Sequence, residues 1–173
     1  TLSSSSAASD VYKRQDIGST LVIVAVAWHL WALWSTLRGS LSGSFAVTVP
    51  FYLAAACFMV ASVAFVVVAA HGVGNYSLLV AAHSRGMVWG FAFLTILGTV
   101  VTLLPTFTRT PISAMARARC SRALTVHCVG LAIAMLADAS GLTRAAGMAQ
   151  LLAVLAAVLI IQPVLAGALG GAK

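Results

Sequence analysis

Acidic residues are almost absent from the sequence: the 173 residues include three Asp and no Glu. Charged residues of both signs make up 8% of the chain and hydrophobic residues 61%, whereas a soluble domain carries about a quarter charged residues. There are too few polar side chains to cover a globule that faces water, so the composition predicts an integral membrane protein. Three acids also cannot form a chain of proton-relaying carboxylates, which argues against a proton-driven pump.

The chain also lacks paired cysteines and catalytic groupings. Cys57, Cys120 and Cys128 form no Cys-x-x-Cys motif, so no structural disulfide is predicted. There is no nucleophile–base set, glycine-rich phosphate loop or carboxylate pair. We therefore expect no catalysis from this chain by itself.

The net charge of +7 comes largely from one short segment between apolar stretches. A nucleic-acid-binding protein would need a basic face on a folded soluble domain, and the sequence shows none. Arginines gathered between apolar stretches are instead typical of a cytoplasmic loop. The clustered residues are Arg109, Arg117, Arg119 and Arg122.

Five apolar stretches are long enough for the roughly 20 residues that a membrane-spanning helix needs. The connections between them are short, which forces neighbouring helices to run antiparallel. The sequence therefore predicts an all-α, polytopic transmembrane bundle with the lipid bilayer as its surroundings. The expected helices cover about 17–38, 45–71, 78–105, 119–138 and 145–169.

Residues 1–16 differ in character from the rest, with a run of serines and no apolar core of a signal peptide. We expect this segment to be a disordered or artefactual leader outside the bundle formed by residues 17–173. We further expect the bundle to be a fragment of a longer protein.

Lys and Arg predict the orientation of the bundle, because they concentrate in cytoplasmic loops. Arg38, the segment 106–122 and Lys173 fall on one side of the membrane, and Arg85 and Arg144 fall on the other. The count predicts a multi-pass protein of the bacterial inner (plasma) membrane whose basic segment 106–122 is cytoplasmic.

The four histidines are the most informative polar residues, because a polar group in a span usually faces the bundle interior. A rise of about 1.5 Å per residue converts position along a helix to depth. It places His71 and His83 near the outer face and His29 and His127 together at an inner level. Haem or copper takes ligands from facing helices at one level, so all four are candidate cofactor ligands. The alternative is that each histidine only hydrogen-bonds a neighbouring helix.

The stretch around His83 holds two further candidates. Met87 follows one helical turn later and could join His83 as a soft metal ligand, although a Met in an apolar helix normally serves packing. Gly86 and Gly90 have the GxxxG spacing that lets a neighbouring helix approach closely.

Three charged residues near the outer end remain. We expect Arg85 to extend toward the lipid headgroups, or alternatively to meet a cofactor carboxylate. Asp138 and Arg144 flank the loop between the last two helices and could pair across it, with little effect on stability.

The third apolar stretch resembles the histidine-rich helix in the membrane module of actinobacterial copper-containing nitrite reductases and related multicopper oxidases. His83 falls on the first His of that pattern, while Arg85 stands at its second His and Met87 at its Asn. This resemblance implies haem or copper at the histidines and cupredoxin domains elsewhere in the full protein. The matching tail consists of LTILGT at 94–99, TLLPT at 102–106 and RT at 109–110.

The same stretch is similar to NnrS-type haem- and copper-containing membrane proteins of the nitric oxide response, through His83, Met87, Trp89, Gly90 and Phe91. Both resemblances imply a membrane module that anchors, or passes electrons to, an extracytoplasmic copper oxidoreductase of the denitrification type. The alternative is a purely structural anchor or assembly subunit without a cofactor.

Overall fold

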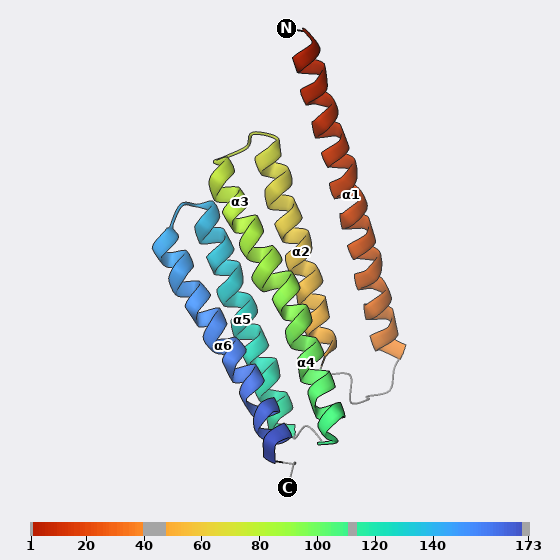
Figure 1. Cartoon of the computed structure of the whole chain (residues 1–173), viewed down its shortest axis with the longest axis vertical. Helices are drawn as coiled ribbons and strands as arrows, with labels where there is room; N and C mark the ends of the chain where they lie inside the picture. The colour runs from red at the N-terminus through yellow and green to blue at the C-terminus, as the bar shows by residue number, and fades with distance from the viewer. Residues whose placement is uncertain (1, 40–47, 111–113, 171–173) are drawn as a thin grey trace.

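The computed structural model describes residues 2–39, 48–110 and 114–170, and every regular element in these ranges is helical (Figure 1). Five helical stretches are long and apolar enough to cross a membrane, which confirms a multi-pass, all-α membrane protein. The 22 residues of α2, for example, extend about 33 Å, enough for a hydrocarbon core of about 30 Å. The elements are α1 (Leu2–Gly39), α2 (Val49–Ala70), α3 (Tyr76–Arg85), the π-helical η2 (Gly86–Ala92), α4 (Phe93–Thr108), α5 (Ala114–Ala139) and α6 (Thr143–Gly170).

The third span, Tyr76–Thr108, is assembled from α3, η2 and α4 and occupies the middle of the bundle. It packs against α2 on one side and against α5 and α6 on the other, while α1 lies at the edge beside α2 (Figure 1). The turn that joins α5 to α6 lies lower than the turn that joins α2 to α3 in the same view. Polar residues of the third span therefore meet helices on both sides.

Local sequence signals set the helix ends. Pro50 lies in the first turn of α2, where its missing N–H is tolerated. The Asn75 side chain caps α3 by accepting hydrogen bonds from two backbone N–H groups. Gly141, with φ of 76°, ends α5 in the left-handed conformation that favours glycine, and Leu142 N–H donates to the Ala137 carbonyl.

The core lies where the third span meets α2, α5 and α6, and the outward faces are apolar and exposed, as lipid-facing surfaces are. Threonines on α4 satisfy their hydroxyls by donating to carbonyls one turn earlier, and Thr99 also contacts the Tyr52 hydroxyl at 2.8 Å. The largest fully buried apolar side chains are Phe51, Leu94, Leu97, Leu131 and Ile160.

Glycines of the third span lie directly against α2, which confirms the predicted packing face. A Cβ atom added at Gly90 would lie 2.5 Å from Phe58 Cβ, and one added at Gly98 would lie 2.8 Å from Phe51 Cβ. Gly86 and Gly90 fall in η2, whose wider turn is shown by Phe93 N–H donating to the carbonyl of Val88, five residues back. Close helix contact and a widened turn thus coincide.

The N-terminal segment is helical where disorder was one expectation, and the other expectation, an artefactual origin, stays a prediction. Residues 2–16, expected to be a disordered or artefactual leader, continue α1 without a break. The first glycine is Gly18 and no proline precedes it, so nothing in this segment interrupts a helix once the apolar part has formed one. Residue 1, residues 45–47 of the second expected helix and Lys173 lie outside the described residues.

Candidate functional site

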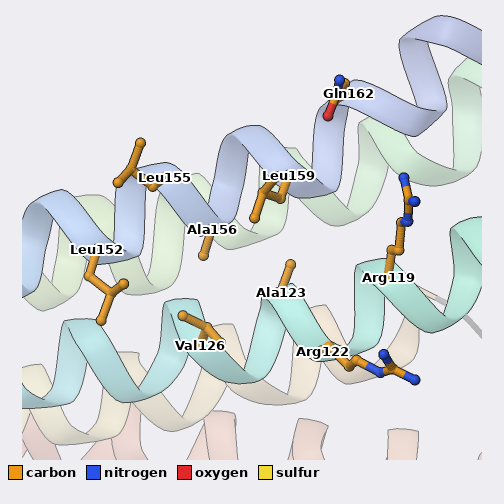
Figure 2. A pocket seen from close by; sticks show the side chains of 9 residues that line it. All are labelled: Arg119, Arg122, Ala123, Val126, Leu152, Leu155, Ala156, Leu159 and Gln162. Carbon is orange, nitrogen blue, oxygen red and sulfur yellow. The ribbon is translucent and has the colours of Figure 1, made fainter.

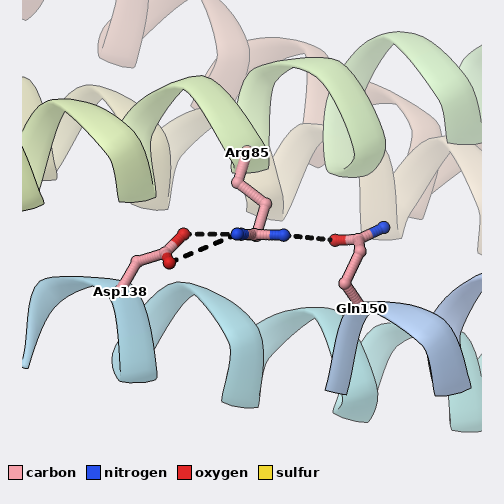
Figure 3. Close-up of polar contacts among 3 residues, drawn as sticks. All are labelled: Arg85, Asp138 and Gln150. Atoms are coloured by element: carbon pink, nitrogen blue, oxygen red, sulfur yellow. Dashed lines mark hydrogen bonds and ion pairs between the residues drawn. The ribbon is translucent and has the colours of Figure 1, made fainter. Parts of the chain in front are cut away.

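Arg85 forms a polar cluster that joins the third span to both α5 and α6 (Figure 3). Its Nε donates to Asp138 Oδ2 at 2.6 Å, its Nη2 to Asp138 Oδ1 at 3.2 Å, and its Nη1 to Gln150 Oε1 at 3.1 Å. The Asp138 side chain is 8% exposed and that of Arg85 is 23% exposed. This two-bond ion pair between helices is the strongest polar contact in the described bundle.

The cluster corrects two expectations, that Arg85 extends to the headgroups and that Asp138 pairs with Arg144. Asp138 lies in the last turn of α5, just before the turn at Gly141, and Gln150 lies two turns into α6. The α5–α6 hairpin ends lower than the α2–α3 hairpin (Figure 1), and the end of α5 supplies the carboxylate to Arg85.

His83 points to the opposite side of α3, toward α2. Its Nδ1 lies 2.8 Å from the backbone carbonyl oxygen of Ser62. A carbonyl can only accept, so Nδ1 carries the proton and Nε2 is the unprotonated nitrogen of the neutral ring. Metal-binding histidines commonly adopt this arrangement, in which a carbonyl fixes one nitrogen and the other is left as the ligand. The half-buried His83 therefore fits one ligand position.

Met87 is half-buried and lies in η2. The spacing from His83 to Met87 crosses from α3 into η2, where backbone hydrogen bonds join residues five apart.

His127 is fully buried and bridges three elements. Its Nδ1 lies 2.8 Å from the Ala153 carbonyl oxygen of α6, and its Nε2 lies 3.3 Å from the Trp89 carbonyl oxygen of η2. The ring also stacks on Phe93, with centroids 5.8 Å apart. Both nitrogens already face backbone oxygens, so metal coordination would require the ring to leave one of them.

The other two histidines lie on the periphery. His71, at the end of α2, contacts Asp16 of α1 at 3.1 Å, and both side chains are about half exposed. His29 is exposed on α1, the edge helix that packs beside α2. The structure therefore does not bring His29 next to His127, because α2 and the third span lie between their helices (Figure 1).

Two buried polar atoms lack a hydrogen-bond partner among the described residues: Ser62 Oγ and Gln150 Nε2. One lies beside the His83 contact and the other in the Arg85 cluster. Groups of this kind are satisfied by water or by a ligand. No local pattern in the sequence points to Ser62 or Gln150; the available signal for this region was Asp138, the one acid after residue 16.

Within residues 2–39, 48–110 and 114–170, no three His, Cys, Asp or Glu side chains come close enough to hold a metal ion together. In the described arrangement the polar contacts of Arg85 connect the third span to α5 and α6. His127 connects the same helices, and His83 is the one histidine whose ring geometry fits a metal ligand. No family model, curated protein or solved structure matches the chain.

Proposed function

We propose that the chain is a membrane module that anchors an extracytoplasmic copper oxidoreductase and that its buried polar residues hold the helices in fixed register. The observation that carries this proposal is the Arg85 cluster, which ties the third span to α5 and α6. His127 adds a second connection among the same helices. A single arrangement of helices presents a fixed surface to a partner, as an anchor requires.

The class of partner is supported by the resemblance of residues 83–110 to the membrane module of copper-containing nitrite reductases. The orientation is supported by the arginines of segment 106–122, which favour a cytoplasmic position. With this orientation the loops at 71–75 and 140–142 face outward, toward the partner. A phosphatase reporter inserted after Gly141 should then be active and one inserted after Arg109 inactive; the reverse pattern would contradict the orientation.

The anchoring role is tested in the native host by removing this chain and fractionating the cells. The copper oxidoreductase activity should move from the membrane fraction to the soluble fraction, because its attachment is lost. A D16A variant serves as the control, since it removes only an exposed carboxylate, and should leave the activity in the membrane. Activity that stays membrane-bound after removal of the chain would refute the anchoring role.

A second candidate function is electron transfer through haem or copper, and the geometry of His83 favours it. The Ser62 carbonyl orients the ring and leaves Nε2 as the ligand atom. His83 would hold the group, and the bound group would supply one-electron chemistry. The described histidines do not form one site, so His83 is the ligand that this structure supports.

An absorption spectrum of the reduced minus the oxidised protein, with metal analysis, distinguishes the two functions. A cofactor-binding protein should lose its Soret band or its copper in H83A and keep it in H29A, because His29 is exposed at the bundle edge. A folded, colourless and metal-free wild-type protein would eliminate electron transfer and leave the anchor.

A further inference from the structure

A groove of about 510 Å³ runs along the surface between α5 and α6. Figure 2 shows Arg119 and Arg122 toward one end of it and Leu152 and Val126 toward the other. The groove therefore joins a cationic end to an apolar length. Its lining consists of Arg119, Arg122, Ala123, Val126, Leu152, Leu155, Ala156, Leu159 and Gln162.

The groove exists because small residues face each other where α5 and α6 meet. Ala123 and Ala156 are almost fully buried and form its floor, and the exposed Leu155 and Leu159 form one wall. From Leu152 to Gln162 the groove follows ten residues of α6, about 15 Å. That length equals one leaflet of a hydrocarbon core about 30 Å thick.

The arginines of the groove have no counterion among the described residues. Both side chains are exposed, and neither takes part in either of the ion pairs, which involve Asp16 and Asp138. Arg119 and Arg122 therefore present two exposed positive charges to which an anion from another molecule can bind.

We propose that this groove binds one anionic phospholipid, with its phosphate at Arg119 and Arg122 and an acyl chain along the apolar length. A second hollow of about 270 Å³, also lined by Arg119 and Gln162, adjoins the cationic end and gives the headgroup room. A second copy of this chain would not complement the site, because its own residues at this end are basic. The lipid site does not depend on the anchoring role, since none of its lining residues belongs to the Arg85 cluster.

The purified full chain in detergent tests the proposal when native mass spectrometry follows binding of phosphatidylglycerol and of phosphatidylcholine with the same acyl chains. One phosphatidylglycerol should bind about 25-fold more tightly, from about fivefold for each of the two arginines beside an anionic headgroup. R119Q/R122Q should reduce this preference to near unity. R109Q/R117Q, which removes the same charge outside the groove, should retain it.

The apolar part of the site is tested by V126W, which fills the groove from a half-exposed position. It should lower the retention of phosphatidylglycerol while the unfolding midpoint stays unchanged. Inorganic phosphate should fail to displace the lipid, because it cannot occupy the apolar length. Four results would each overturn the proposal. Two concern binding: equal losses in the two double-arginine variants, or equal binding of the two lipids. The other two are full displacement of the lipid by phosphate and a dimer that excludes lipid.

Discussion

Replacing Asp138 by Ala removes the carboxylate that neutralises Arg85 and leaves a guanidinium inside the bundle with Gln150 as its partner. The change deletes two of the three hydrogen bonds that Arg85 donates. Breaking a buried ion pair from one side is more harmful than deleting both partners, because an uncompensated charge remains. D138A should therefore be less stable than a variant that removes both charges.

A lower and an upper bound set the loss of free energy of unfolding that we expect for D138A. Two interhelical hydrogen bonds at about 0.6 kcal/mol each give a loss of about 1.2 kcal/mol. A fully buried pair broken from one side would lose about 3–5 kcal/mol, but the Arg85 side chain is 23% exposed and reaches partial solvation. We expect D138A to lower the free energy of unfolding by about 2–3 kcal/mol. R85L/D138L should lie within about 1 kcal/mol of the wild type.

Equilibrium unfolding in mixed micelles, followed by circular dichroism as the denaturing detergent increases, measures both variants. D16A is the matched control, because Asp16 and His71 form an ion pair whose side chains are 44% and 50% exposed; it should change the free energy by less than about 0.5 kcal/mol. If R85L/D138L is as unstable as D138A, or if D138A matches D16A, the uncompensated charge is not what destabilises the bundle.

The remaining predictions concern packing and burial. G90A should lose about 1–3 kcal/mol of stability, because its Cβ would lie 2.5 Å from a side chain of α2; G147A, with nothing within 4 Å, should be neutral or up to about 1 kcal/mol more stable, and the same unfolding assay measures both. H127F should lose about 1 kcal/mol, since the ring loses its interhelical N–H hydrogen bond to a backbone carbonyl, of which a neutral imidazole donates one; an unchanged midpoint would contradict that bridge. In membranes a lipid-soluble thiol reagent should label the exposed Cys57 and spare the buried Cys120 until denaturation; equal rates would show that α5 is not packed as described.

Hydropathy and local signals were enough to predict the helices. Each of the five expected stretches became a span, because a run of about 20 apolar residues has no other stable arrangement in a bilayer. Pro50 at the start of α2 and the GxxxG spacing of Gly86 and Gly90 also acted as their chemistry indicates. These features depend on residues close in sequence or on the bilayer itself.

The Arg85 cluster could not be predicted from local sequence patterns, because it depends on the relative levels of two helical hairpins. Arg85 and Asp138 are 53 residues apart, and their contact requires the α5–α6 hairpin to end lower than the α2–α3 hairpin. Depth estimated from helix starts assumes that all hairpins reach the same level. Electroneutrality was the usable signal: a lone acid in the later spans of a basic chain is most stable beside an intramembrane arginine.

The histidines show why depth alone cannot predict a ligand pair. His29 and His127 were placed at one level, but level says nothing about which helices are neighbours or which face of a helix points inward. In the structure His29 lies on the edge helix. His127 is buried against η2 and α6, where each ring nitrogen faces a backbone carbonyl oxygen. His83 remains a candidate ligand for a different reason: one carbonyl fixes its tautomer and leaves Nε2 unprotonated. Ligand prediction in a helical bundle therefore needs the order of helices and the partner of each ring nitrogen before depth becomes informative.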